Sequence, residues 1–382
     1  MDEIYQEMNN SDSFSLLHVA RDIRKISGGV PKVVNQLLKA KLKNINSVAL
    51  ATIGECDKKN ISIINESRIF QYWGWSLNQS EEIKKIISNN DIIHIHGVWS
   101  SVQFFSAKIA SNLKIPFVLS AHGMLEPWLW NNQGYKTYLK KYIYWHFIAK
   151  NKLNKANIIH AITDMEFKNL KELFPHNKIV KIPNAIDLSV YESKKNRIDY
   201  KKDILFMGRI EPKKGLHILL EAFYKSNFKS DWHLKIAGPV WDKKYMQSIK
   251  NFIKKNNLSN QITFLGPVFD QEKLHLLQNS WFMVTPSFSD AVGLVNLEAA
   301  ANYLPSITTY NTGLADWEEG GGYLIDCNVE SLKNKMLIAS QWSIKEREDR
   351  GIESYNHVKR CYSWEYVTPL WSKLYKDLYN DR

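Results

Sequence analysis

Short segments made almost entirely of apolar residues recur along this chain, and helical patterns separate them. They lie at 15–20, 91–97, 116–123, 157–163 and 179–184, and then at 204–208, 233–238, 262–266, 281–286 and 306–309. Strands that are apolar throughout are buried on both faces, and their alternation with helices is typical of a parallel, doubly wound sheet. The pattern therefore predicts two successive α/β halves of similar design.

The length of 382 residues is more than one ordinary α/β core holds, so two domains are expected. Residues 193–203 are charged and poor in large aliphatic side chains, which is typical of a linker. We therefore expect an N-terminal Rossmann-like domain over 1–195 and a C-terminal one over 196–363. The aromatic-rich tail, 364–382, is expected to form a helix that packs back toward the N-terminal domain.

Composition narrows the class of protein. There is no apolar run of membrane-spanning length, and the polar N-terminus does not resemble a signal peptide. The 3 cysteines are widely spaced, which favours a reduced, cytoplasmic protein without a disulfide framework. The net charge of +12 indicates an anionic partner, and nucleic acid, anionic lipid and phosphorylated small molecules all satisfy it.

The second half places two cations and two carboxylates after predicted strands. Arg209 and Lys214 share the loop GRIEPKKG, where a planar guanidinium and an ammonium can neutralise a diphosphate. Asp290 and Glu298 flank a glycine turn and a helix expected to begin near Leu294. That helix start can bind phosphate, and the carboxylates can accept hydrogen bonds from sugar hydroxyls. Taken singly, the same residues also fit a solvated basic loop, an N-cap aspartate and an ordinary helical glutamate.

The first half offers weaker signals. Gly28 and Gly29 lie in a strand-to-helix loop, where glycines let backbone N–H groups approach phosphate, although a plain turn has the same composition. His122 follows a predicted strand and can hydrogen-bond a substrate hydroxyl. His94 and His96 have the spacing of metal ligands, but no third ligand has a supporting spacing, so we expect no metal.

Ligands of open α/β sheets bind at the carboxyl ends of the strands, and several predicted strands end there in glycine or proline. Two such domains can face each other across a central cleft. A small-molecule donor held in that cleft is therefore the expected arrangement.

Taken together and in order, eight segments resemble retaining glycosyltransferase family 4, also described as glycosyl transferases group 1, with the GT-B fold. The resemblance runs from Leu16 to about Asp326. Its markers are SGGVPKVV, DIIHIHG, SAHGM, IPNAIDL, ILFMGRIEPKKGLHILLEAF, LKIAGP, ITFLGPV and VTPSFSDAVGLVNLEAAA. No single marker decides the matter, but the ordered set is highly specific.

The resemblance implies roles for the matching residues. Arg209 and Lys214 would hold the diphosphate of a nucleotide sugar, His122 would touch the transferred sugar, and Glu298 would bind the ribose. The remaining contacts with the donor would come from Gly28, Gly29, Pro267, Val268, Gly293, Leu294 and Val295. The family usually has a glutamate where this chain has Asp290, which keeps the charge but shortens its reach to the sugar.

The resemblance also implies a mechanism. Such enzymes retain the anomeric configuration and use no metal or other cofactor, and the donor is a co-substrate. UDP-sugars and GDP-mannose both fit. The rival readings are a nucleotide-sugar epimerase or a sugar phosphorylase of the same fold, and a basic nucleic-acid-binding protein. The last is disfavoured because the lysines are spread out and no nucleic-acid motif occurs.

Residues 135–155 bear on the prediction of the acceptor, because they are basic and aromatic. They suit a helix that lies on an anionic membrane surface, or one packed on its own domain. Trp128 and Trp130 can stack on sugar rings or belong to the core. We expect a cytoplasmic enzyme, peripheral at the inner face of a bacterial membrane. It would transfer a hexose to a lipid-linked glycan of an O-antigen, capsule or lipopolysaccharide.

Overall fold

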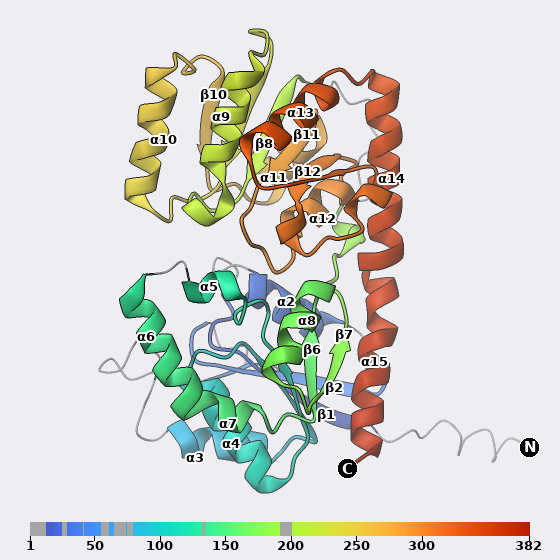
Figure 1. Cartoon of the computed structure of the whole chain (residues 1–382). Helices are drawn as coiled ribbons and strands as arrows, with labels where there is room; N and C mark the ends of the chain where they lie inside the picture. The colour runs from blue at the N-terminus through green and yellow to red at the C-terminus, as the bar shows by residue number, and fades with distance from the viewer. Residues whose placement is uncertain are drawn as a thin grey trace, which may run out of the picture. The chain divides into compact units, whose positions relative to one another are not determined.

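The computed structural model describes residues 13–24, 29–40, 42–54, 61–64, 74, 79–131, 134–191 and 201–382. The chain forms two compact units (Figure 1). The first contains the chain up to Pro183 together with Val367–Arg382, and the second is Asn184–Tyr366. The expected boundary after residue 195 falls among residues 192–200, which lie outside the described part of the chain.

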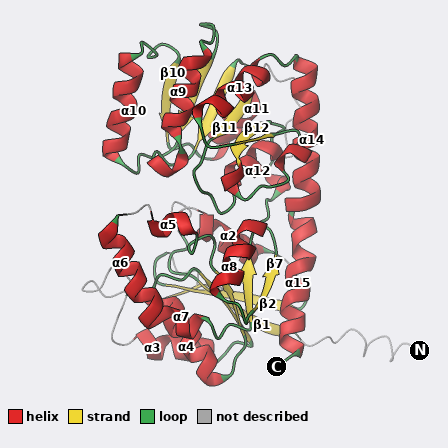
Figure 2. Ribbon diagram, in the orientation of Figure 1, coloured by secondary structure: helices red, strands yellow, loops and turns green. Residues whose placement is uncertain are grey.

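The first unit is built on a 7-stranded sheet in the order β3-β2-β1-β4-β5-β6-β7, and its strand pairs are parallel. Figure 2 draws the strands in yellow and the helices in red. The strands are β1 (Phe14–Val19), β2 (Ile45–Ala51), β3 (Ile61–Ile63), β4 (Ile92–His96), β5 (Phe117–Ser120), β6 (Ile158–Ala161) and β7 (Lys178–Lys181). The helices are α2 (Gly29–Lys39), α3 (Gln79–Ile87), α4 (Ser101–Leu113), α5 (Pro127–Asn131), α6 (Tyr135–Ile143), the π-helix η2 (Tyr144–Ala149), α7 (Lys150–Leu153), α8 (Asp164–Leu173) and most of α15 (Trp364–Asn380).

The second unit repeats this design on a 6-stranded parallel sheet in the order β10-β9-β8-β11-β12-β13. The strands are β8 (Asp203–Met207), β9 (His233–Ala237), β10 (Ile262–Gly266), β11 (Phe282–Thr285), β12 (Ser306–Thr309) and β13 (Tyr323–Ile325). The helices are α9 (Leu216–Ser226), α10 (Lys243–Lys255), α11 (Asp270–Asn279), α12 (Leu294–Ala301), α13 (Val329–Ser340) and α14 (Ile344–Tyr362), with 3-10 turns η3 (Leu188–Val190), η4 (Pro212–Lys214), η5 (Tyr310–Thr312) and η6 (Trp317–Gly320). The prediction of two parallel, doubly wound α/β halves is confirmed.

Three strands are absent from the sequence prediction. β2 begins Ile-Asn-Ser, so two of its first three residues are polar and its apolar pattern starts late. β3 and β13 have only 3 residues each and stand at the edges of their sheets. A run of three residues is too short to show a strand pattern, even in β13, where Leu324 and Ile325 are buried. The predicted linker also extends too far, since its last residue, Asp203, is buried and begins β8.

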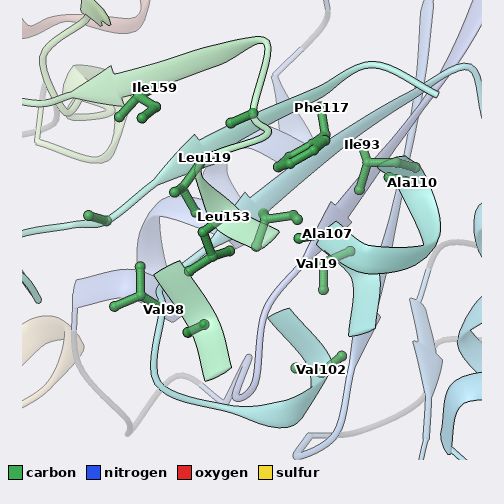
Figure 3. Packing of buried hydrophobic residues seen from close by; sticks show 14 of the residues in the cluster. Val19, Ile93, Val98, Val102, Ala107, Ala110, Phe117, Leu119, Leu153 and Ile159 are labelled. Carbon is green, nitrogen blue, oxygen red and sulfur yellow. The ribbon is translucent and has the colours of Figure 1, made fainter. Parts of the chain in front are cut away.

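The two faces of the first sheet differ in chemistry. Alternate residues of the central strands, such as Val19, Ile93, Leu119 and Ile159, pack in a purely apolar core with α4 and α7 (Figure 3). The intervening residues point to the opposite face, which α15 covers with a row of aromatic rings. Several of those intervening residues are histidines, so this face is buried yet polar.

In the second sheet, the residues of the central strand β8 that follow Asp203 are apolar on both faces. Ile204 and Phe206 of β8 pack in one hydrophobic cluster, and Leu205 and Met207 of the same strand pack in another. A strand whose alternate residues enter two cores is rigid, because each face is fixed by separate packing. The loops that leave its carboxyl end are therefore held on a firm base.

Candidate functional site

The strand order of the second unit reverses direction between β8 and β11. From β8 the chain proceeds to β9 and β10 on one side, and β11 leads to β12 and β13 on the other. The loops that follow β8 and β11 therefore flank the topological switch point, where open α/β sheets bind ligands. These loops are residues 208–215 and 286–293, which contain three of the predicted charged residues.

Gly215 brings these two loops together. It ends the 3-10 turn η4 with a φ of +66°, and a Cβ at this position would lie 1.9 Å from the carbonyl oxygen of Pro286. The N–H of Phe288 donates a 2.9 Å hydrogen bond to the carbonyl of Lys213, which joins the loops at a second point. Only glycine allows the backbones to approach this closely, so the pairing of the loops is encoded locally.

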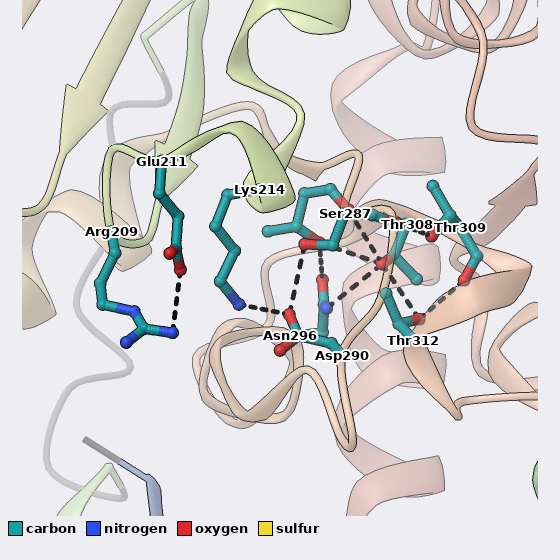
Figure 4. A network of polar contacts seen from close by, with 10 residues as sticks. Arg209, Glu211, Lys214, Ser287, Asp290, Asn296, Thr308, Thr309 and Thr312 are labelled. Carbon is teal, nitrogen blue, oxygen red and sulfur yellow. Dashed lines mark hydrogen bonds and ion pairs between the residues drawn. The ribbon is translucent and has the colours of Figure 1, made fainter. Parts of the chain in front are cut away.

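The paired loops place Lys214 against Asp290. The Nζ of Lys214 lies 2.5 Å from Oδ2 of Asp290, and the side chains are 17% and 18% exposed (Figure 4). Asp290 also accepts a 3.2 Å hydrogen bond from the hydroxyl of Ser287, and its N–H donates to the carbonyl of Asn311. The ammonium is thus held in one place and remains reachable by a ligand.

Arg209 supplies a second, more exposed cation on the same loop. Its guanidinium contacts Glu211 at 2.8 Å and lies 4.9 Å from the ring centre of Trp241, and its side chain is 44% exposed. Burial lowers the pKa of the neighbouring Lys213, which also feels the charges of Asp290, Lys214, Glu211 and Arg209. These charges therefore act on one small region, as the loop sequence predicts.

The start of α12 lies beside this charged region. Gly293 precedes the helix, and no side chain caps it. A Cβ on Gly293 would lie 2.4 Å from the side-chain nitrogen Nδ2 of Asn296. The side-chain oxygen Oδ1 of Asn296 accepts hydrogen bonds from the hydroxyls of Thr285 and Ser306. A helix start without a side-chain cap can offer N–H groups to an anion, although those of Leu294 and Asn296 already donate to the carbonyls of Val292 and Gly293, both at 2.7 Å. The helix predicted to begin near Leu294 begins there.

The other residues predicted to bind the donor are spread around α12. The side chain of Glu298 is 5% exposed and forms an ion pair with Lys273 of α11 at 2.5 Å. Glu298 therefore belongs to a different ion pair from Lys214 and Asp290. Val268 is buried in a core cluster, whereas Pro267 is exposed. Leu294 and Val295 are half-buried. Val268 can therefore offer a ligand little more than its backbone.

In the first unit, His122 follows β5 with a φ of +53°, which is unusual for a residue with a side chain. The carboxylate of Glu166 fixes this turn, because it accepts hydrogen bonds from the N–H groups of Gly123 (2.6 Å) and Ile162 (2.8 Å). Burial raises the pKa of Glu166 to about 7 and lowers that of His122 to about 3. The His122 ring is thus neutral at physiological pH.

The structure says less about the predicted roles of the glycines and tryptophans of the first unit. Gly28 lies outside the described residues, and Gly29 is the exposed first residue of α2. Trp128 and Trp130 lie on α5 and are half-buried. Trp130 packs on the core and contacts the rings of Trp99 and Tyr138. It also lines a surface pocket of about 310 Å³ with Tyr138. Trp130 therefore packs on the core with part of its ring and faces the pocket with another part.

Sequence reasoning missed His18. This residue lies opposite His94 in the parallel register of β1 and β4, and His18, His94 and His96 bring ring nitrogens within 4.8 Å of one another. A histidine near the end of each of two strands was visible in the sequence. Only the adjacency of β1 and β4, which are far apart along the chain, makes these residues neighbours.

Comparison with known proteins matches both halves of the chain. The family described as Glycosyltransferase Family 4 matches residues 27–190, and Glycosyl transferases group 1 matches residues 191–356. An uncharacterized glycosyltransferase of Methanocaldococcus jannaschii is 28% identical over 92% of this chain and 95% of its own length. O-antigen chain mannosyltransferase B of Escherichia coli is 23% identical over 59% of this chain and 61% of its own.

Among solved structures, HepE of Anabaena in complex with UDP and glucose superposes with a TM-score of 0.76. That match covers 95% of this chain and all of HepE, at 15% identity. The two parallel-sheet units have the GT-B fold, and the two family models that match 27–190 and 191–356 both describe glycosyltransferases. The chain belongs to the GT-B glycosyltransferases, with one of the two matched families in each half.

Proposed function

We propose that this protein transfers a hexose from a nucleotide diphosphate sugar to a hydroxyl of a growing surface glycan, with retention of the anomeric configuration. The observation that carries the proposal is the placement of Lys214, Asp290 and Arg209 on loops beside the switch point of the second sheet. Two fixed cations and an uncapped helix start suit a diphosphate, which carries its charge on several oxygens.

The donor is a UDP-sugar or a GDP-sugar. Support for the first comes from HepE, whose solved structure holds UDP and glucose. Support for the second comes from the likeness to an O-antigen mannosyltransferase. In either case Glu298 would accept hydrogen bonds from the ribose, and the backbone at Pro267 and Val268 would meet the base.

The chemistry proposed for the site is electrostatic. The acceptor oxygen bonds to the anomeric carbon as the bond between that carbon and the diphosphate breaks, and the acceptor proton passes to an oxygen of the leaving phosphate. Negative charge grows on the leaving oxygen, and Lys214 and Arg209 stabilise it without having to reorganise. His122 would contact the transferred sugar as a neutral ring. Since these side chains supply the positive charge, the step needs no metal ion or cofactor in this proposal.

The acceptor is proposed to be lipid-linked and to be met at a membrane surface, on the evidence of α6 and η2. Tyr135 and Phe147 are 77% and 78% exposed, and the lysines of α6 stand among such residues. The α-helix ends at Ile143 and a π-helix follows. Tyr138, Tyr142 and Trp145 line one pocket, in which Tyr138 and Tyr142 are exposed and Trp145 is buried. Among the described residues, no helix is long and apolar enough to cross a bilayer.

A liposome experiment tests the membrane part. The protein should sediment with vesicles that contain phosphatidylglycerol and much less with pure phosphatidylcholine, because binding combines apolar burial with attraction of lysines to anionic lipid. Phe147→Ser should weaken sedimentation. Ile344→Ser, which removes a side chain that is 61% exposed in the second unit, should not. Equal sedimentation with both lipids would contradict the proposal.

The reaction itself is tested by incubating the purified protein with a panel of UDP- and GDP-sugars and an acceptor glycan in the presence of EDTA. We expect a new glycosidic bond whose anomeric configuration, measured by the one-bond coupling between C1 and H1, matches that of the donor. Inversion of the anomer, or a requirement for a divalent metal, would overturn the proposed mechanism. An isomerised donor, or a free sugar phosphate, would identify an epimerase or a phosphorylase instead.

A further inference from the structure

The polar face of the first sheet contains a connected set of histidines. His18 on β1, His94 and His96 on β4, Ser120 on β5 and His160 on β6 are buried and side by side in the parallel register. Their hydrogen bonds form two separate chains, of which the second ends at His122. The direction of each chain decides which nitrogen of every ring carries a proton.

The first chain has one possible direction. His160 Nε2 lies 2.8 Å from the carbonyl oxygen of Ile182, which only accepts, so Nε2 carries the proton and Nδ1 accepts from Ser120 at 2.7 Å. Ser120 must then accept from Nε2 of His94, at 2.7 Å. The other nitrogen of His94 accepts from the hydroxyl of Tyr375 on α15, also at 2.7 Å. Burial lowers the pKa of both rings, so His94 and His160 are neutral, and these contacts place the proton of each on Nε2.

The second chain joins His18, His96 and His122. Nδ1 of His18 lies 3.0 Å from Nε2 of His96, and Nδ1 of His96 lies 2.9 Å from Nε2 of His122. With neutral rings this chain can run either way. Either His18 donates toward His122, or His122 donates toward His18, and the choice sets the proton on all three rings.

The far end of the chain decides the direction. Nε2 of His18 is buried and has no hydrogen-bond partner among the described residues. If His122 donated toward His18, this atom would be a buried N–H without an acceptor, which is the rarer and costlier defect in native proteins. If His18 donates, the atom is only an unused acceptor. Burial lowers the pKa of His18 to about 3, which keeps the ring neutral.

A metal ion held by His18, His94 and His96 is the competing use of the same atoms. Both ring nitrogens of His94 and of His96 already have partners at 2.7 to 3.0 Å, and only His18 has an unused one. A metal would need one lone pair from each ring and would disrupt both chains. The hydrogen-bonded arrangement satisfies more of these atoms, so we favour it.

We propose that His18 and His96 are positioning residues that hold His122 as the neutral tautomer with its proton on Nδ1, so that His122 presents a hydrogen-bond donor to its ligand. Nε2 of His122 is occupied by His96, and Nδ1 has no partner among the described residues. The tautomer stands on these contacts alone. Its meaning for catalysis rests on the proposed function, in which His122 donates to an oxygen of the transferred sugar and does not act as a base.

Nuclear magnetic resonance of the ¹⁵N-histidine-labelled protein tests the tautomers without substrate. Long-range ¹H–¹⁵N correlations distinguish the two neutral forms, and single His→Gln variants assign the signals. We expect Nδ1–H for His18, His96 and His122, and Nε2–H for His94 and His160. An Nε2–H signal for His122, or the shift of a metal-bound nitrogen at His18, would overturn the proposal.

A pair of variants at His96 then tests the positioning role. His96→Asn keeps an N–H at the place of Nδ1 and should preserve the Nδ1–H tautomer of His122. His96→Leu removes that donor, so His122 should no longer be restricted to one tautomer. We expect kcat to fall about tenfold or more in His96→Leu, with KM little changed and with His96→Asn close to wild type. Equal loss in both folded variants would overturn the positioning role. Inactivity of the wild-type protein with its expected tautomers would count against the proposed function only.

Discussion

Replacement of Lys214 by alanine should lower kcat about 100-fold or more, because it removes one preorganised cation from the leaving diphosphate. Lys214 is held by Asp290 at 2.5 Å on a loop that glycine contacts fix, so its charge is already in place before the reaction. Steady-state kinetics with the best donor measures the effect. The circular dichroism spectrum should be unchanged, since the side chain belongs to a loop and not to either core.

Lys202→Ala is the matched control. Lys202 also pairs with a carboxylate, Asp231 at 2.6 Å, but it precedes β8 and so lies at the opposite end of that strand from the loop with Lys214. Its loss changes the net charge equally and should leave kcat within about twofold, as expected for a half-exposed surface pair. Near-normal turnover in Lys214→Ala would remove the loop after β8 from the proposed mechanism.

Gly215→Ala should destabilise the second unit and reduce activity together. A left-handed conformation costs a residue with a side chain about 1 to 2 kcal/mol. In addition, the new Cβ would meet the carbonyl oxygen of Pro286 at 1.9 Å, so the two loops must separate. We expect a clear fall in Tm, and a loss of turnover that persists well below Tm because Lys214 and Asp290 are displaced.

Gly266→Ala separates the clash from the backbone conformation. Gly266 has a φ of +72°, close to the +66° of Gly215, but a Cβ there would have no atom within 4 Å. Gly266→Ala should lose only the free energy of holding alanine in a left-handed backbone conformation, so it should lower Tm less than Gly215→Ala does. If the two variants lose the same stability, the contact between the loops is not what requires glycine at 215.

The fold was largely predictable because the central strands are buried on both faces. β4, β5, β6, β8 and β11 each have at least three apolar residues among their four or five, and the helices between them imply a parallel sheet. The edge strands β3 and β13 were not predictable, since a run of three residues is too short to show a strand pattern. β2 was not predicted for a different reason, which is that two of its first three residues are polar.

The site was predictable only in part. The chemistry of Arg209, Lys214 and Asp290 follows from their types and from their positions after strands, and the structure joins the last two in an ion pair. That Glu298 pairs with Lys273 depends on how α12 packs on α11, which no local pattern encodes. The histidine chains behind His122 depend on the order β1-β4-β5-β6, which brings distant residues into register.

The most direct test of the account is calorimetric titration of UDP and of GDP into the wild-type protein and into Lys214→Ala. We predict that the wild-type protein binds at least one of the two. We also predict that Lys214→Ala binds it about tenfold or more weakly, since a hydrogen bond to a charged group contributes about 1.5 to 3 kcal/mol. Failure of both nucleotides to bind, or an equal Kd in the two proteins, would contradict the claim that this loop holds the donor diphosphate.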